Sequence, residues 1–151
     1  AHDPFIDPKK MHDANVEPVS FDDLLTRSDY LSLHTPLNPR TRHIIDAVAL
    51  EQMKPSAFII NTSRGPIIDE AALVLTLQTG SIAGAGLDVF EVEPASHDNP
   101  LFEMPNVITT PHHGGDSDEM WEFGPMSVME DVAGVLNGGQ PRSVQNPAVL
   151  S

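Results

Sequence analysis

Ala57-Phe58-Ile59-Ile60-Asn61-Thr62-Ser63-Arg64-Gly65-Pro66 joins a short apolar run to a tight polar turn. The apolar part predicts a buried strand. Asp69 then caps a predicted helix that runs from Ala71 to Thr79. Arg64 is therefore expected just past the carboxyl end of a strand, where open α/β sheets bind their ligands. The alternative for Arg64 is a solvated surface charge, since most charged loop residues carry no function.

The composition is that of one globular domain with an apolar core, because 40% of the 151 residues are hydrophobic and 20% are charged. Eight basic and 22 acidic residues give a formal charge of −14, which argues against nucleic acids and anionic membranes as partners. The sequence has no Cys, which excludes a disulfide framework and a thiolate metal site. No apolar run approaches ~18 residues and no basic, apolar leader is present, so we expect no membrane span, no signal peptide and a cytoplasmic location.

Three further strands are predicted, at residues 30–33, 83–88 and 107–110. Helical patterns at 47–53 and 71–79 lie in the first two intervals between strands, which indicates βαβ units, a parallel sheet and the α/β fold class. The carboxyl ends of parallel strands share one edge of a sheet, so the polar residues that follow them should converge. These residues are His34, Arg64, Asp88 with Glu93 beyond it, and His112.

The remaining segments predict smaller elements around this sheet. A short helix is expected at 8–12, a brief strand at 16–19, and a helix over 20–27 that opens on a capping-box-like Ser20-Phe21-Asp22-Asp23. The helix at 71–79 is apolar nearly all round, so we expect it to be well buried. A last helix is expected over about 117–137, and Gly124-Pro125 should break or kink it.

Arg64, Glu93 and His112 make a chemically coherent set. A guanidinium binds a carboxylate through two parallel hydrogen bonds, and an imidazole transfers protons near neutral pH. A carboxylate beside the imidazole orients the ring and favours its charged form. The set suits a carboxylate-bearing substrate whose neighbouring carbon changes between carbonyl and hydroxyl. The sequence has no nucleophile elbow, Walker loop or His-Glu-x-x-His motif.

Four spaced motifs give this sequence a family resemblance that spans nearly the whole chain. They are Ser28 to Asn38 (SDYLSLHTPLN), Met53-Lys54-Pro55 through Asn61-Thr62-Ser63-Arg64-Gly65, Gly86-Leu87-Asp88-Val89-Phe90 with Glu93-Pro94, and Asn106-Val107 with Thr110-Pro111-His112. The sequence resembles the NAD-dependent D-isomer-specific 2-hydroxyacid dehydrogenases, which include phosphoglycerate dehydrogenase and glyoxylate/hydroxypyruvate reductase.

The resemblance implies an enzyme that transfers a hydride between NAD(H) and a small 2-hydroxy or 2-keto acid. It implies that Arg64 binds the substrate carboxylate and carbonyl, that His112 is the acid/base on the C2 oxygen, and that Glu93 pairs with His112. It also implies that Asp88 holds the nicotinamide carboxamide, and it implies no metal. The cofactor-binding residues implied are Asp3, His34, Thr35, Pro36, Thr62, Ser63, Arg64, Asp88, His112, Gly114 and Gly115.

The resemblance also implies how much of a dehydrogenase is present. Asp3 matches the acid that closes the second Rossmann strand, where it would bind the adenosine ribose and favour NAD over NADP. The Gly-x-Gly-x-x-Gly turn that cradles the pyrophosphate is not in the sequence, and neither is the first strand. We therefore expect a partial, doubly wound Rossmann-type sheet from the C-terminal portion of a longer, homodimeric protein. Residues 1–139 would belong to its NAD-binding domain and 140–151 to a tail returning to a substrate domain. The isolated chain should bind NAD weakly or not at all and be inactive.

Other interpretations remain open on the sequence. Singly, Asp3 suits a turn residue, His34 a loop anchor, Asp88 a strand-end cap and Glu93 a solvated charge. His113 stands where the family usually has a small or apolar residue, and the sequence leaves it open whether it supports the site from behind or is a tolerated surface His. A two-His metal site is also possible, although adjacent His side chains diverge and no third ligand is evident. The chain could also be a non-enzymatic NAD-sensing module, like the dehydrogenase-fold corepressors, or an inactive truncated remnant.

Overall fold

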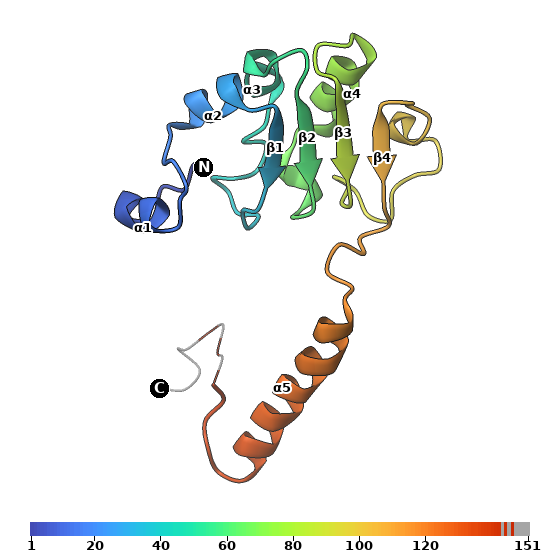
Figure 1. Cartoon of the computed structure of the whole chain (residues 1–151). Coiled ribbons are helices and arrows are strands. Elements are labelled where there is room, and N and C mark those ends of the chain that lie inside the picture. The colour runs from blue at the N-terminus through green and yellow to red at the C-terminus, as the bar shows by residue number, and fades with distance from the viewer. Residues whose placement is uncertain (143, 145, 147–151) are drawn as a thin grey trace. The chain divides into compact units, whose positions relative to one another are not determined.

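The computed structural model describes residues 1–142, 144 and 146. The chain divides into two compact units, residues 1–114 and residues 115–151, and each unit is described here by itself (Figure 1). The predicted boundary at 139/140 concerns domains of a longer protein and stays a prediction. Part of the predicted tail, residues 143, 145 and 147–151, lies outside the described residues.

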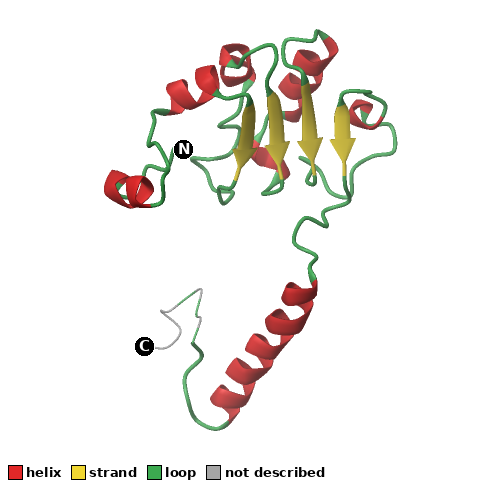
Figure 2. Cartoon of the chain, viewed as in Figure 1, coloured by secondary structure: helices red, strands yellow, loops and turns green. Residues whose placement is uncertain are grey.

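The first unit is built on a four-stranded parallel sheet with the strand order β1-β2-β3-β4 (Figure 2). The strands are β1 (Tyr30–Leu33), β2 (Phe58–Asn61), β3 (Gly84–Leu87) and β4 (Val107–Thr109). Tyr30 is opposite Phe58, Phe58 opposite Gly84, and Ala85 opposite Val107. All four carboxyl ends therefore lie at one edge, which confirms the predicted α/β class and the predicted convergence of the strand-end loops.

Helices α1 (Pro8–Asp13) and α2 (Phe21–Arg27) precede β1. Helices α3 (Ala47–Gln52) and α4 (Glu70–Gln78), with short 3₁₀ helices η1 (Gly65–Ile67) and η2 (Pro100–Phe102), lie in the connections between the strands. Side chains cap them as the sequence indicates. Ser20 Oγ accepts the N–H of Asp23 at 3.0 Å, and Asp69 Oδ1 accepts the N–H of Ala72 at 3.0 Å. Among the described residues, none of the helices is long and apolar enough to cross a bilayer.

The core of the first unit lies on one face of the sheet. The face made by Leu31, Ile59 and Leu87 is buried against apolar residues of α2, α3 and α4, such as Leu25, Leu50, Leu73 and Leu77. Each fully buried Leu or Ile contributes about 1.5–3 kcal/mol. The opposite face carries exposed side chains, with Tyr30 72% and Ile108 75% exposed. The buried face holds the strands in register and so fixes where their carboxyl-end loops emerge.

One prediction near the N-terminus is wrong. Residues 16–19 form no strand, because Pro18 has no N–H and the N–H groups of Val16 and Val19 bond to different partners, the carbonyls of Met11 and Ala1. The match of Asp3 to the acid at the end of the second Rossmann strand stays a prediction. Its Oδ1 accepts the N–H of Phe5 at 2.8 Å, which is the turn role that its position before Pro4 also allowed.

Two predictions about helices need correction. Helix α4 is only partly buried, because Leu73 and Leu77 face the core whereas Leu75 is 63% exposed. In the second unit, α5 (Asp118–Leu136) runs through Gly124 and Pro125 without a break. Pro125 removes only its own hydrogen bond to the carbonyl four residues earlier, and the turns on either side continue. Arg142 also bonds back to α5, through Glu130 at 2.7 Å and Asp131 at 2.8 Å.

Candidate active site

The turn that presents Arg64 is held by the buried Asn61 at the end of β2. Asn61 Nδ2 donates to the Arg64 carbonyl at 3.0 Å, and its Oδ1 accepts the N–H of Ser63 at 3.0 Å. The Ser63 hydroxyl donates to the carbonyl of Thr35, which lies past the end of β1. The loops after β1 and β2 are therefore tied together. The exposed Arg64 guanidinium donates from Nη1 to the Ser63 carbonyl at 2.6 Å.

Gly65 brings this turn against the loop after β3. A Cβ added at Gly65 would lie 1.8 Å from the carbonyl oxygen of Phe90 and 2.5 Å from the nitrogen of Glu91. Only glycine allows this approach, because backbone atoms cannot rotate away as a side chain does. The turn carrying Arg64 therefore packs directly on the segment that leads to Glu93.

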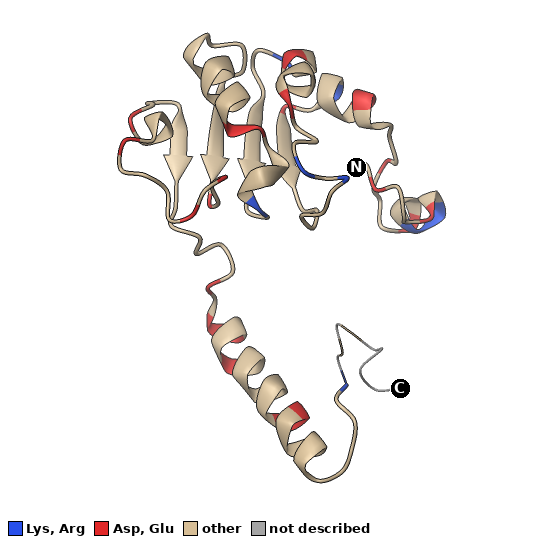
Figure 3. Cartoon of the chain, turned by 180° about the vertical axis from the view of Figure 1, so that it is seen from behind, with Lys and Arg blue, Asp and Glu red and all other residues tan. Residues whose placement is uncertain are grey.

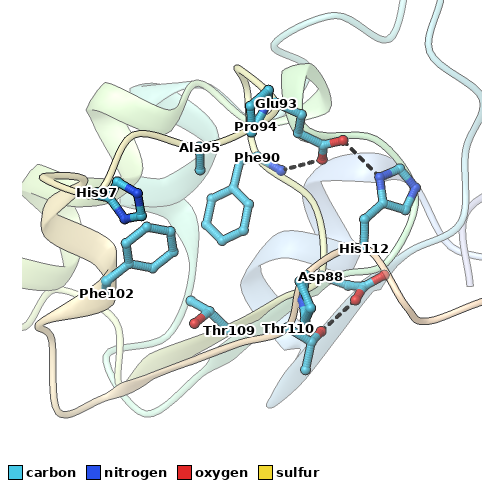
Figure 4. Close-up of a pocket in the computed structure, with 11 residues that line it drawn as sticks. Asp88, Phe90, Glu93, Pro94, Ala95, His97, Phe102, Thr109, Thr110 and His112 are labelled. Carbon is cyan, nitrogen blue, oxygen red and sulfur yellow. Dashed lines mark hydrogen bonds and ion pairs between the residues drawn. The ribbon is translucent and has the colours of Figure 1, made fainter.

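Glu93 and His112 form a direct pair between the loops after β3 and β4 (Figure 4). His112 Nδ1 lies 2.8 Å from Glu93 Oε2, and the N–H of Phe90 donates to Glu93 Oε1 at 2.9 Å. Burial by itself would raise the pKa of Glu93. The bonds from Phe90 and His112 and the charges of His112 and Arg64 outweigh it and hold this pKa below its usual value. Because Nδ1 faces a carboxylate, Nε2 is the ring nitrogen left to exchange a proton with a substrate.

Asp88 fixes the turn on which His112 stands. This carboxylate is only 4% exposed and accepts the Thr110 hydroxyl and the N–H groups of His113 and Gly114, the last two at 2.8 and 2.7 Å. Burial would raise the pKa of Asp88, but these three donors and the charge of His112 lower it. The clamp holds His112 in the left-handed backbone region, at φ 59°. The hydrogen bond to Asp88 also gives Thr110 a structural role, whereas the sequence motif had named this residue without assigning it one.

The residues at this edge fit the nicotinamide end of a dinucleotide. A carboxylate has about four acceptor positions, and Asp88 uses three, so one remains for an amide N–H. The exposed Thr62 lies in the turn after β2, next to Ser63. His34 bonds to Ser32 Oγ at 2.8 Å, as a loop anchor would, and the Pro36 carbonyl accepts the Thr41 hydroxyl at 2.7 Å. The role of Asp88 toward the carboxamide, which the family resemblance implies, stays a prediction.

A pocket of about 410 Å³ lies beside the Glu93–His112 pair (Figure 4). Its wall is largely apolar, with Phe90 and Phe102 in edge-to-face contact at 5.3 Å between ring centroids. None of its eleven lining residues is Lys or Arg, and Arg64 is not among them. Acidic residues outnumber basic ones over the chain as a whole, by 22 to 8 (Figure 3). The lining therefore contains no Lys or Arg that could pair with an anionic carboxylate, and Arg64, whose charge lowers the pKa of Glu93, lies outside it.

Asp88→Asn is expected to lower the free energy of unfolding by about 2–3 kcal/mol at pH 7. The Asn amide replaces one acceptor oxygen with an NH₂ donor, which would face the hydroxyl and N–H donors that Asp88 accepts. The pKa of Asp88 is lowered by folding, so its stabilisation is complete above the unfolded pKa of about 3.9 and is lost as pH falls through the folded value. Urea unfolding at neutral and acidic pH measures this. Asp13→Asn, at an exposed position, is the control. If Asp88→Asn lowered the free energy of unfolding by the same amount in acid as at neutral pH, the expectation would be contradicted.

Comparison with known proteins agrees with this geometry. Residues 1–114 match the family model described as "D-isomer specific 2-hydroxyacid dehydrogenase, NAD binding domain". The chain belongs to this family. The match confirms the fold class and the cofactor, NAD, that were predicted from the sequence motifs.

Two relatives of the family show how much of a full-length protein is present. The chain is 41% identical over 138 residues to D-3-phosphoglycerate dehydrogenase of Mycobacterium leprae, covering 91% of this chain and 26% of the relative. It is also 41% identical over 144 residues to glyoxylate reductase of Thermococcus litoralis, covering 95% of this chain and 43% of the relative. The chain thus spans about a quarter to less than half of the length of these relatives.

A solved structure of the family supports the fold of the chain. D-isomer specific 2-hydroxyacid dehydrogenase from Lactobacillus delbrueckii ssp. bulgaricus, in its NAD-complexed form, aligns with a TM-score of 0.85 and 33% identity. The alignment covers 97% of this chain and 48% of that structure. At this identity the likeness extends from fold to family.

The structure brings together most of the site residues proposed from the sequence. Arg64, Asp88, Glu93 and His112 lie in the strand-end loops, linked through Gly65 and Phe90. Thr35 joins them through Ser63, and Gly114 through Asp88. The contacts of Asp3 are local, so its role toward a ribose stays a prediction. Sequence reasoning missed Thr110 and a cluster around Glu91, because their bonds depend on how separate loops meet.

Proposed function

We propose that this chain is part of a longer NAD-dependent dehydrogenase that interconverts a 2-keto acid and its D-2-hydroxy acid. The observation that carries the proposal is the Glu93–His112 pair, 2.8 Å apart, beside the turn that presents Arg64. An imidazole held by a carboxylate and a nearby guanidinium supply a proton donor and a carboxylate anchor. The names of the relatives, D-3-phosphoglycerate dehydrogenase and glyoxylate reductase, support this class of substrate.

The roles of the residues follow from their chemistry. Arg64 binds the carboxylate of the keto acid and orients its C2 carbonyl. When bound, NADH supplies the hydride that reduces C2. Protonated His112 gives its Nε2 proton to the C2 oxygen, so hydride and proton together convert the carbonyl to a hydroxyl. Glu93 orients the ring through Nδ1, so that Nε2 faces the substrate. Asp88 holds the carboxamide and the turn that carries His112.

Other features of the longer protein belong to the same proposal. It would be a homodimer in the cytoplasm, with residues 1–139 in its NAD-binding domain and the tail from 140 leading to a substrate domain. Asp3 would favour NAD over NADP. The net charge of −14 disfavours nucleic acids and anionic membranes as partners.

Arg64→Ala in the longer protein is expected to lower kcat/KM for keto acids by about 10²- to 10⁴-fold, since two charge-assisted hydrogen bonds are lost. NADH oxidation with glyoxylate and with hydroxypyruvate measures this. Arg27→Ala is the matched control, because Arg27 is paired with Glu17 on the exposed side of α2. Unchanged turnover by Arg64→Ala would overturn the assignment. NADH binding without turnover by the unmodified protein would favour the NAD-sensing module instead.

A further inference from the structure

Glu91, two residues before Glu93, lies in an ionic cluster that the proposed reaction does not use. Its carboxylate is 24% exposed, and Oε1 accepts His43 Nε2 at 2.8 Å and Arg42 Nη2 at 3.0 Å. Arg42 and His43 belong to the connection after β1, where the His43 N–H donates to the carbonyl of Pro66. Glu91 therefore ties the loop after β3 to the connection after β1.

A second set of bonds ties Glu91 to the start of α4. The N–H of Glu91 donates to Glu70 Oε2 at 2.8 Å, and Glu91 Oε2 accepts the N–H of Glu70 at 3.3 Å. Glu70 Oε1 in turn accepts Asn99 Nδ2 at 2.8 Å. Helix α4 follows the Arg64 turn after the short η1 helix. The same residue thus links the segment that bears Glu93 to the segment that follows Arg64.

This cluster differs from an isolated surface ion pair, which contributes little because solvent screens it. Glu91 is partly buried and accepts three donors from two segments, so removing it leaves several groups without their partner at once. The loop that it holds, from Phe90 to Glu93, contains no helix or strand of its own. Its conformation therefore depends on such side-chain bonds and on the packing against Gly65.

We infer that Glu91 is a positioning residue that holds Glu93 against His112 and at a fixed spacing from Arg64. The inference deepens the proposed function and rests on it for its catalytic consequence. Glu91 acts through Glu93, since its own bonds go to Arg42, His43 and Glu70. Its loss should loosen the loop and leave the strands in place.

Two measurements test this on Glu91→Ala, with Glu103→Ala as the control for the loss of one negative charge from an exposed side chain. Amide hydrogen exchange of the 151-residue chain reports the Phe90 N–H, which donates to Glu93, and the Ala85 N–H, which donates within the sheet to the Asn106 carbonyl. We expect exchange at Phe90 to accelerate by about tenfold or more while Ala85 is unchanged. In the longer protein, kcat should fall by about 10²-fold with an unchanged KM for the keto acid.

Glu91→Gln keeps the size and an acceptor oxygen, so it should fold and show a smaller change of the same kind at Phe90. Unchanged exchange at Phe90 in both variants, or equal acceleration at Phe90 and Ala85, would overturn the positioning role. If the unmodified longer protein shows no keto-acid turnover, the proposed function fails, and the exchange rates still decide the role of Glu91.

Discussion

His112→Asn in the longer protein is expected to lower kcat for keto-acid reduction by about 10²- to 10⁴-fold. Asn keeps a hydrogen-bonding group near Glu93 but cannot carry the proton that the C2 oxygen needs. KM should change little, because the carboxylate of the substrate is bound by Arg64 rather than by the imidazole. Steady-state oxidation of NADH measures both constants. His12→Asn, which alters an exposed residue of α1, is the control.

The pairing of His112 with Glu93 makes this prediction sharper. Glu93→Gln should also lower kcat, because Oε2 accepts from the ring at Nδ1 and so fixes which ring nitrogen faces the substrate. If the two residues act as one unit, the double variant His112→Asn, Glu93→Gln should be no slower than His112→Asn alone. Additive losses in the double variant would mean that Glu93 acts independently of His112, contrary to the pair seen at 2.8 Å.

The parallel sheet could be predicted from sequence because its signals are local. The apolar run before Asn61 and the small residues before Asp88 each indicate a strand, and their spacing leaves room only for helical crossovers. The convergence of Arg64, Glu93 and His112 then follows from one geometric fact, that parallel strands share a carboxyl edge.

The bonds within the site could not be predicted in the same way. Thr110 bonds to Asp88, and His43 bonds to Glu91, because tertiary packing brings residues of separate loops together. Residues 16–19 had the composition of a strand, but their backbone bonds go to Ala1 and Met11 rather than to a strand of the sheet. Local pattern therefore fixed which loops carry the chemistry, and tertiary packing fixed how those loops hold one another.

Gly65→Ala is expected to lower the free energy of unfolding of the chain by about 3 kcal/mol or more. The new Cβ would lie 1.8 Å from the Phe90 oxygen and 1.9 Å from the Phe90 carbonyl carbon, far inside ordinary contact at 3.4–4 Å. Both atoms belong to the backbone, so the Arg64 turn and the loop to Glu93 must move apart. Urea unfolding of the 151-residue chain measures the loss.

Gly86→Ala is the matched control, since its Cβ would meet only Ile60 Cγ1, at 3.8 Å. That substitution should leave the stability nearly unchanged or raise it by about 0.4–1 kcal/mol, because Ala restricts the unfolded chain more than Gly does. Equal stability of the Gly65→Ala and Gly86→Ala chains would contradict the close packing of the two loops. In the longer protein, Gly65→Ala should also reduce kcat/KM for keto acids, because it separates Arg64 from Glu93 without altering either side chain.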